Sequence, residues 1–402
     1  MRRDWKSEWK AMMASPYGRW YMAVLLMALC YQWIFQREWV DTAEYLRKAQ
    51  SIWAGWTPRD SDRLLEYSRR SPLFGLLLWA LGPLYSLVSA LLSLLTLLQL
   101  RMWIREQSSY QNAPEYATVF WLFHPLLLVY AVVPMPECIC LWLLLAWLRA
   151  LSSSNEWVLG MTAAALLALK PVFAVLLPLM VLAQFMGLIS SFTVRKAAIM
   201  VLPLALVWGF NSFDNYRALG FWHFSSMGLT NALEYNLPAY GSAIELSDAA
   251  GNAAETATVW KEQIRQVVWG NPLRVIWIHL RGVVLGLLDP GRYDIWAFFG
   301  AQGDAQHMKA LIKGNFQALT WNAGLLFMAI GALVQALFLV CITFGLMKNG
   351  NFRQHQFWAL VVLVFLGLSG PVASARYTLL VYPILALWFS EGWGSRKERR
   401  FR

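Results

Sequence analysis

The stretch RWYMAVLLMALCYQWIF, from Arg19 to Phe35, decides the fold class of this chain because it is long, apolar and free of helix breakers. A helix of about 17–25 apolar residues crosses the hydrocarbon core of a bilayer. No small-residue cleavage pattern follows this run, so we expect it to stay in the protein as a first span. Positive residues remain on the cytoplasmic side, so the segment after Phe35 should lie outside the cell. The preceding tail supplies these positive residues: Arg2, Arg3, Lys6 and Lys10.

The composition extends this conclusion to the whole chain. Hydrophobic residues make up 58% of the sequence, charged residues make up 14%, and the mean hydropathy is +0.44. These values exceed what one soluble core can bury, and they predict an all-α polytopic membrane protein. The 23 Trp and 15 Tyr fit the same class, because amphipathic rings settle at the membrane boundary and anchor the ends of spanning helices.

Charge and cysteine content exclude two other classes. The net charge of +11 could indicate nucleic acid, but the basic residues gather at the termini and in short loops, which membrane topology explains better. The cysteines are scattered and show no CxxC pair or metal-type spacing with the histidines. We therefore expect no structural disulfide and no zinc site. The four cysteines are Cys30, Cys138, Cys140 and Cys341.

Further apolar runs bring the expected number of transmembrane helices to about ten. Basic residues near their ends fall on the cytoplasmic side of this topology, as do both chain termini. The apolar segment from Pro72 to Leu81 is too short to cross, and Gly82-Pro83 ends it, so we expect a helix in the outer interface. The runs are 84–104, 115–133, 136–150, 156–169, 171–188, 194–212, 318–346, 356–371 and 374–391.

This topology predicts three regions. Residues 1–212 form an N-terminal membrane module whose first extracytoplasmic loop is 36–83. Residues 213–317 form an extracytoplasmic region with juxtamembrane helices, and residues 318–402 carry the C-terminal spans and a basic cytoplasmic tail. Charged residues within 271–290 favour an amphipathic helix beside the membrane, because a charge at mid-bilayer costs roughly 2.5–3.5 kcal/mol.

The first outer loop carries the residues of greatest chemical interest. Asp41, Glu44 and Tyr45 recur at i, i+3 and i+4, which places two carboxylates and a phenol on one helix face. The same spacing of the two acids also fits a capping box at a helix start. Downstream, Arg69 and Arg70 stand directly before Pro72, where guanidinium groups suit phosphate or, alternatively, lipid headgroups.

Other ionisable residues fall at the outer ends of expected spans. Glu137 opens the helix after the turn AVVPMPE, where an acid is also ordinary helix-dipole chemistry. Lys170 in LALKPVF and Arg376 with Tyr377 in SARYTLLVYP lie on the same side of the membrane. Snorkelling to the interface is the simplest explanation for such cations, but ionisable groups there are also candidates for function. Acids and cations converging at the outer leaflet indicate a site for a lipid phosphate beside a base, as glycosyl transfer from a lipid carrier needs.

The series of motifs resembles the GT-C superfamily of integral membrane glycosyltransferases, particularly the bacterial branch similar to protein mannosyltransferases and to the aminoarabinose transferase of lipid A. The matching segments keep their order along nearly the whole chain, although no single motif is specific. They are DTAEYLRKAQSIWAG (41–55), RRSPLFGLLL (69–78), the PMPE turn ending at Glu137, ALKP (168–171), the stretch 210–236 and SARYTLLVYP (374–383).

The resemblance implies a sugar donor linked to polyprenyl phosphate and a glycan or lipid acceptor, with transfer on the outer face of the bacterial inner membrane. It implies that Asp41, with Glu44 beside it, is the catalytic acid pair. It also implies a phosphate site and a substrate cavity. The phosphate-binding residues would be Arg376, Lys170, Arg70, Arg69 and Tyr377, and the cavity residues would be Tyr45, Glu137, Asn215, Tyr216 and Tyr235.

One departure from the family bears on cofactors. Many relatives carry two adjacent acids, whereas here Thr42 and Ala43 follow Asp41. The sequence therefore lacks the paired acidic motif that would support a divalent metal, and we predict no specific cofactor. Two other functions remain open: an O-antigen-type polymerase or ligase, which would depend on arginines of the long outer loop, and a flippase or transporter of lipid-linked sugars. Against a transporter stands the absence of paired Gly/Pro-interrupted spans in two halves.

Overall fold

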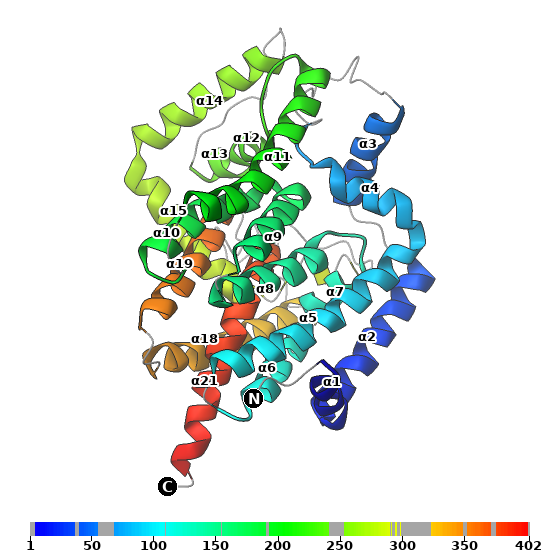
Figure 1. Ribbon diagram of the computed structural model, residues 1–402, viewed down its shortest axis with the longest axis vertical. Helices are drawn as coiled ribbons and strands as arrows, with labels where there is room; N and C mark the ends of the chain where they lie inside the picture. The colour runs from blue at the N-terminus through cyan, green and yellow to red at the C-terminus, as the bar shows by residue number, and fades with distance from the viewer. Residues whose placement is uncertain are drawn as a thin grey trace.

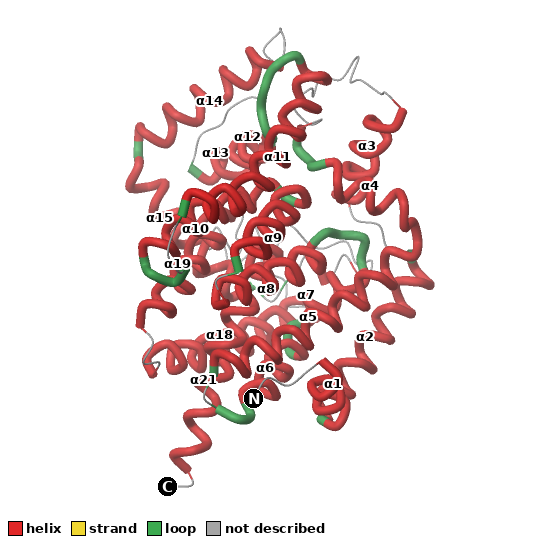
Figure 2. Tube along the Cα trace, viewed as in Figure 1, coloured by secondary structure: helices red, strands yellow, loops and turns green. Residues whose placement is uncertain are grey.

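The chain is all-helical wherever a computed structural model describes it, and no strand occurs in that part (Figures 1 and 2). The expected all-α fold is confirmed for these residues. The described residues are 5–36, 40–54, 68–108, 110–153, 155–189, 193–240, 253–289, 291, 294–295, 298, 323–348, 352–370 and 375–400.

The N-terminal helices follow the hydrophobic pattern of the sequence. The first apolar run forms α2, which begins with Pro16, where a missing backbone N–H costs nothing, and ends at Gln36 with a left-handed φ of 44°. Helix α1 packs against α2 and α5, and α3 packs against α4. The helices are α1 (Trp5–Ala14), α2 (Pro16–Phe35), α3 (Val40–Ala54), α4 (Pro72–Leu81), the 3-10 turn η2 (Gly82–Leu84) and α5 (Tyr85–Gln107).

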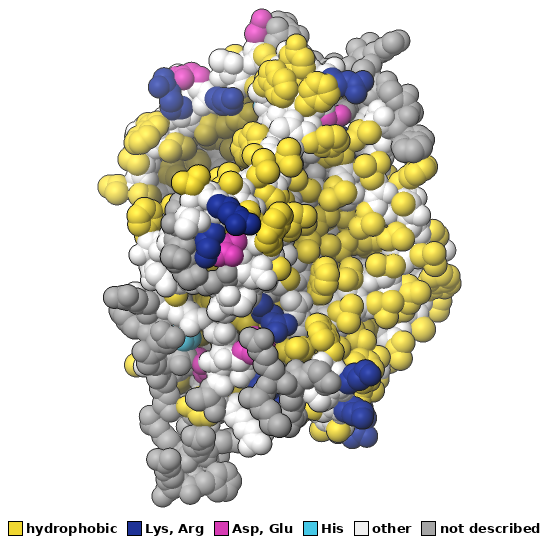
Figure 3. Space-filling view, viewed as in Figure 1, with side chains coloured by type: hydrophobic (Ala, Val, Ile, Leu, Met, Phe, Trp, Pro, Cys, Tyr) yellow, Lys and Arg dark blue, Asp and Glu magenta, His cyan; other side chains and the backbone are white. Residues whose placement is uncertain are grey.

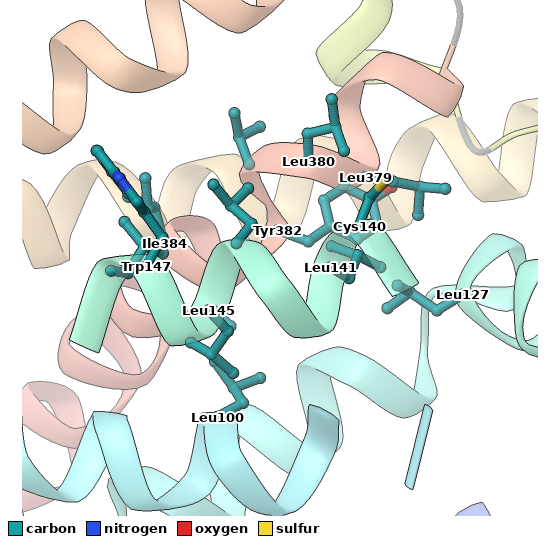
Figure 4. Packing of buried hydrophobic residues seen from close by; sticks show 14 of the residues in the cluster. Leu100, Leu127, Cys140, Leu141, Leu145, Trp147, Leu379, Leu380, Tyr382 and Ile384 are labelled. Carbon is teal, nitrogen blue, oxygen red and sulfur yellow. The ribbon is translucent and has the colours of Figure 1, made fainter. Parts of the chain in front are cut away.

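Helix α8 lies at the centre of the bundle, between α5 and α9. Figure 4 shows Leu145 of α8 facing Leu100 of α5, and both side chains are fully buried. The other side of α8 meets Leu379 and Tyr382 from the C-terminal part of the chain. Close packing of this kind holds helices together in a bilayer, where lipid is as apolar as the side chains. The surrounding helices are α6 (Ala113–Leu122), α7 (Pro125–Val132), α8 (Glu137–Ser153) and α9 (Glu156–Leu169).

Helix α11 continues past the expected boundary at 212 and ends at Leu219. Its last turn carries Arg217, which suits the negative end of a helix, and Gly220 closes it with a φ of 78°. The polar residues expected to start a loop are therefore helical. The elements here are η3 (Pro171–Val175), α10 (Leu176–Phe185), α11 (Val194–Leu219), α12 (Met227–Asn231), the π-helical η4 (Ala232–Asn236) and α13 (Leu237–Ala239).

The C-terminal helices close the bundle around α8. Helix α18 packs along α21, and α15 packs along α19. Gly345 and Gly392 lie at the crossing of α18 and α21, where a Cβ at Gly392 would be 1.8 Å from the Cys341 carbonyl oxygen. These elements are α14 (Ala253–Gly270), α15 (Pro272–Leu288), α18 (Ala323–Lys348), α19 (Phe352–Ser369), α20 (Ala375–Thr378), the 3-10 turn η7 (Leu379–Val381) and α21 (Tyr382–Arg400).

Several helices have the length and composition to cross a membrane. Pro72–Gln107 and Val194–Leu219 do so as single helical stretches. Two helix pairs, bent by 73° and 94° at short breaks, raise the total to four if each pair is one span. The pairs are Ala113–Leu122 with Pro125–Val132, and Ala253–Gly270 with Pro272–Leu288. The chain thus has two to four candidate spans within the described residues, and about ten crossings stay a prediction from hydropathy.

The surface of the molecule fits a membrane environment. Figure 3 shows hydrophobic side chains covering the face over α2, α4 and α5, with charged side chains nearer the two ends. The exposed hydrophobic residues of these helices include Trp33 and Ile34 of α2 and Leu91 of α5. Helix α1 and the end of α21 lie at the lower end of the view, whereas α3 and α14 lie toward the upper end (Figure 1). The expected cytoplasmic tail and the first outer loop therefore belong to opposite ends.

A glycine sets the position of α3, the helix that carries Asp41. A Cβ at Gly75 of α4 would be 2.1 Å from the Tyr45 carbonyl oxygen, so only glycine permits this crossing. The α3 helix is also tied to the turn before α8, because the Thr42 hydroxyl donates to the Pro134 carbonyl oxygen at 3.1 Å. These contacts fix the helix face on which the acids lie.

Candidate functional site

Helix α3 presents a polar face with helical spacing, as the sequence predicted. Asp41 lies in its first turn, one turn before Glu44 and Tyr45. Both oxygens of Asp41 are engaged by arginines: Oδ1 lies 2.7 Å from Arg70 Nη2, and Oδ2 pairs with Arg376 Nη1. The acid therefore pairs with cations from other segments instead of serving as a helix cap.

The segment before α4 supplies the first pair of cations. Arg70 Nε donates to Glu44 Oε2 at 2.7 Å, and Arg69 Nη1 lies 3.8 Å from Glu44 Oε1. The Arg70 guanidinium also stands 5.1 Å from the centroid of the buried Tyr45 ring, a cation–π distance. Arg70 is thus held by two carboxylates and an aromatic face. That environment is unlike that of a snorkelling side chain.

Glu137 is the buried member of the group. It opens α8, is fully buried, and accepts from Lys170 Nζ at 2.6 Å through Oε1. The same oxygen accepts from Arg376 Nε, so one guanidinium bridges Glu137 and Asp41. Glu137 Oε2 has no hydrogen-bond partner among the described residues. An unsatisfied buried carboxylate oxygen is costly, and it can accept a hydrogen bond from a bound molecule.

We call this group the charged cluster. It consists of Asp41, Glu44, Arg69, Arg70, Glu137, Lys170 and Arg376. The cluster joins five separate segments: α3, the residues before α4, the start of α8, the end of α9 and α20. Four cations and three carboxylates leave a formal charge of +1, which favours an anion. The side chains of Asp41 and Arg376 are 20% and 19% exposed, so a ligand can reach both.

The cations control the ionisation of Asp41. Burial alone would raise its pKa, but Arg376 and Arg70 outweigh burial and lower the pKa to about 2. Asp41 is therefore a carboxylate at neutral pH. Its basicity is low while both guanidinium groups bind it, and it would rise if a phosphate drew them away.

Two residues that the sequence reasoning missed extend the cluster inward. The Tyr130 hydroxyl donates to Asp294 Oδ1 at 2.8 Å, and the Arg376 guanidinium lies 6.0 Å from the centroid of the Tyr130 ring. Burial raises the pKa of Asp294 to about 6, although Arg376 lowers it. The sequence gives no signal for this pair, because Tyr130 lies in an apolar run and Asp294 in a distant polar one.

Lys48 and Asp214 were also missed. Lys48 Nζ lies 2.5 Å from Asp214 Oδ2 and 3.4 Å from Asn215 Oδ1. Burial lowers the pKa of Lys48 to about 8, while Asp214 favours its charged form. A signal for Lys48 existed, because it follows Glu44 by four residues and so continues the same helix face. Asp214 was missed because the sequence analysis ended this helix at residue 212 and assigned the residues that follow to a loop.

The structure separates some residues that the sequence reasoning grouped together. Asn215 is buried, whereas Tyr216 is exposed and stacks on Trp222 with ring centroids 5.1 Å apart. Successive helical residues point in different directions, so the Tyr216 side chain lies away from the buried Asn215 side chain. Tyr377 is half-buried, and none of its described contacts joins the charged cluster. The side chain of Tyr235 lies outside the described residues.

The described residues contain neither a cluster of metal-type ligands nor a disulfide. No three His, Cys, Asp or Glu side chains of that part gather closely enough to hold a metal ion. The cluster carboxylates are instead paired with Arg and Lys. All four cysteines are free thiols, three of them buried.

No family model matches the chain, and no curated protein is similar enough to count as a relative.

Proposed function

We propose that this chain is a membrane glycosyltransferase of the GT-C type, which transfers a sugar from a polyprenyl-phosphate donor to a lipid-linked or cell-surface glycan. The observation that carries the proposal is the charged cluster, in which a partly exposed carboxylate, Asp41, touches two guanidinium groups from distant segments. Such a pairing supports both tasks of the reaction: a base for the attacking hydroxyl and cations for the departing phosphate.

In this proposal the acceptor hydroxyl oxygen attacks the anomeric carbon of the donor sugar, and its proton passes to Asp41. The bond between that carbon and the phosphate oxygen breaks, and polyprenyl phosphate leaves with the bonding electrons. Arg376, Lys170, Arg70 and Arg69 stabilise the negative charge that develops on the phosphate. A single displacement of this kind inverts the anomeric carbon.

The cluster geometry also suggests an order of events. Arg376 bridges Asp41 and Glu137 before any phosphate is bound. A phosphate that captures Arg376 leaves Glu137 paired with Lys170, so the buried acid stays neutralised while Asp41 gains basicity. Donor binding thus prepares the base in this scheme.

The proposed setting is the bacterial inner membrane, with about ten spans and both termini in the cytoplasm. The cluster would then face outward. Its position supports this arrangement, because α3 and α1 lie at opposite ends of the molecule (Figure 1). The partners in this proposal are the polyprenyl-phosphate-sugar donor, the glycan or lipid acceptor and the surrounding membrane lipids.

The decisive test is transfer by purified protein supplied with prenyl-phosphate sugars. We expect Asp41→Asn to lower the rate by about 100- to 10,000-fold, the range for loss of a general base, with little change in melting temperature. The matched control is Arg274→Ala, because the Arg274 side chain is exposed on α15 and its described bond is made by the backbone N–H. Full activity of Asp41→Asn removes the assignment. Loss of activity only in Arg274→Ala favours a polymerase or ligase, and lipid transport without product favours a transporter.

A further inference from the structure

Asp294 is a buried acid that stands beside the charged cluster and takes no part in the ion pairs described for it. The residue is 6% exposed, and its Oδ1 accepts a hydrogen bond from the Tyr130 hydroxyl at 2.8 Å. Tyr130 in turn presents its ring to the Arg376 guanidinium, which lies 6.0 Å from the ring centroid. Asp294 is therefore linked to the cation that bridges Asp41 and Glu137.

The turn after α15 brings Asp294 to this place. The Asp289 carboxylate accepts from the Gly291 backbone N–H at 3.0 Å, and Gly291 has a left-handed φ of 84°. A Cβ at Gly291 would be 2.7 Å from a methyl carbon of Leu126, so glycine allows the turn to lie against α7. Helix α7 is also the helix that carries Tyr130.

The hydrogen bond from Tyr130 does not explain why this position carries an acid. A carboxamide of the same shape would accept from the hydroxyl equally well. Burial raises the pKa of Asp294 to about 6, although Arg376 lowers it, so keeping the acid ionised costs folding free energy. What a carboxyl group adds is a proton that can be bound and released near neutral pH. That proton can lie on Oδ2, because Tyr130 uses Oδ1.

The charge of Asp294 decides whether the surroundings of Arg376 are positive or neutral. The charged cluster has four cations and three carboxylates, and so a formal charge of +1. Protonated Asp294 leaves this charge unchanged, whereas ionised Asp294 adds a fourth carboxylate and cancels it. A phosphate that binds Arg376 is therefore attracted more strongly while Asp294 holds its proton.

The charged groups that face Asp294 connect its proton to phosphate binding. Besides burial, Glu137 of α8 and Asp289 of the turn favour the protonated acid, whereas Arg376 of α20 favours the ionised one. A phosphate on Arg376 offsets the charge of this cation, and the repulsion by the two acids remains. Phosphate binding should then raise the affinity of Asp294 for a proton, and by linkage the proton raises the affinity for phosphate by the same factor.

We propose that the charged cluster binds a lipid phosphate together with a proton, which Asp294 takes up from the surrounding water. The inference rests on the proposed function, because the phosphate is that of the sugar donor. Asp294 is a positioning residue in this scheme, since it acts on the phosphate through Tyr130 and Arg376. The phosphate gains negative charge during the proposed transfer, and a proton on Asp294 favours that step. Loss of the proton afterwards favours release of the product.

The test is the affinity of full-length protein, in nanodiscs of phosphatidylcholine, for undecaprenyl methyl phosphate between pH 5 and 7.5. This lipid is a phosphodiester whose single charge stays constant in that range, whereas a phosphate monoester titrates at about pH 6. We expect the wild-type affinity to fall about 3- to 20-fold as pH rises, the order expected for repulsion between like charges in a partly buried site. Asp294→Asn should bind at every pH about as tightly as wild type does at pH 5.

Two further variants should give shifts that a purely structural role of Asp294 would not give. Tyr130→Phe removes the hydrogen bond that favours the ionised acid, so the midpoint of the pH dependence should move to higher pH. Asp289→Asn removes a charge that favours the protonated acid, so the midpoint should move to lower pH. Its carboxamide oxygen can still accept from the Gly291 N–H. These shifts test the proposal even if Asp294→Asn unfolds early, and a midpoint that stays fixed in both variants overturns it.

Glu255→Gln is the matched control, because it removes one negative charge from an exposed side chain of α14, which packs on α12, α15 and η4. This variant should keep the wild-type pH dependence, and neutral undecaprenol should bind independently of pH. An equal pH dependence for undecaprenol, or its equal loss in Glu255→Gln, overturns the assignment to Asp294.

The outcomes separate this inference from the proposed function. A wild-type affinity for the phosphodiester that does not change with pH overturns proton uptake and leaves the phosphate site standing. The wild-type pH dependence in Asp294→Asn does the same. Failure of wild type to bind undecaprenyl methyl phosphate at any pH overturns the proposed function itself.

Discussion

Two groups of arginines and carboxylates lie at opposite ends of the molecule, and they differ in how far solvent reaches one ion pair in each, Arg101 with Glu8 and Arg376 with Asp41. At the end that carries α1, Arg101 and Glu8 are both fully buried, with Nε and Oε1 2.8 Å apart. Arg105 and Glu115 complete this group at 3.0 Å from Glu8 and 2.6 Å from Arg101, and their side chains are 28% and 31% exposed. In the charged cluster, by contrast, Asp41, Arg376 and Lys170 all keep part of their surface exposed.

This contrast agrees with a structural role for the Arg101 group and with the ligand-binding role proposed above for the charged cluster. The central pair of Arg101 and Glu8 is sealed, and Arg101 also donates to the Thr118 hydroxyl at 2.6 Å, so no ligand can come between Arg101 and Glu8. Its effect is to tie α1 to α5 and α6. The charged cluster has the same chemistry with an opening, and its geometry allows an external anion to exchange with a carboxylate. The exposure of the Arg376–Asp41 pair, compared with the burial of the Arg101–Glu8 pair, distinguishes the two.

Breaking the sealed group should have the largest effect on stability. Arg101→Ala leaves Glu8 as a buried charge that has lost its main partner, and we expect a loss of about 3–5 kcal/mol in the free energy of unfolding. Thermal unfolding in detergent measures this. Asp41→Asn, the corresponding change in the open cluster, should shift the melting temperature far less. Similar losses in both variants would contradict the contrast drawn here.

The pH dependence of stability sharpens the contrast within the open cluster. The pKa of Asp294 is raised from 3.8 to about 6, so the folded state holds a proton that the unfolded state has lost, and stability falls as pH rises from about 4 to about 6. Asn at this position carries no charge, so Asp294→Asn should be more stable at pH 7 by on the order of 1–3 kcal/mol and should lose that slope. Arg376, Glu137 and Asp289 act on the charge of this acid and the Tyr130 hydroxyl donates to it, so all four stay unchanged in the comparison.

The contribution of Asp41 to stability should change with pH in the opposite direction and over a lower pH range. Its pKa is lowered from 3.8 to about 2, so its contribution is present above about pH 4 and is lost as pH falls toward 2. Unfolding free energies of wild type, Asp294→Asn and Asp41→Asn between pH 2 and 8 separate the two. An unchanged slope in Asp294→Asn between pH 4 and 6 would rule out the raised pKa.

A smaller effect is expected from the glycine that positions α3. Gly75→Ala places a Cβ against the Tyr45 carbonyl oxygen and should cost about 1–3 kcal/mol while it displaces Asp41 from its arginines. Gly209→Ala is the matched control, because a Cβ at Gly209 meets nothing within 4 Å and alanine favours the helix. Melting temperature and binding of undecaprenyl phosphate are the measurements. If the two variants behave alike, the close crossing does not hold the cluster.

The sequence predicted the parts of this molecule that depend on local pattern. Apolar runs predicted the helices. The spacing of Asp41, Glu44 and Tyr45 predicted one face of a helix, and the structure shows that helix as α3. Arg101 shows the limit of such patterns. Its position near the end of an apolar run indicated topology, but nothing in the run reveals that Glu8 neutralises it. Pairs such as Tyr130 with Asp294 depend on how distant helices pack, which local periodicity does not encode.

The two bonds of Arg376 also bear on how the protein is made. Helices α3, α8 and α9 leave the ribosome long before α20, so Asp41 and Glu137 first meet only Arg70 and Lys170. Each of those early pairs is electrically neutral, so it leaves no unpaired charge in a bundle that is only partly assembled. Arg376 arrives near the end of translation and joins the two pairs. The cluster is thus completed last, which delays the activity proposed for it until the rest of the chain has been made.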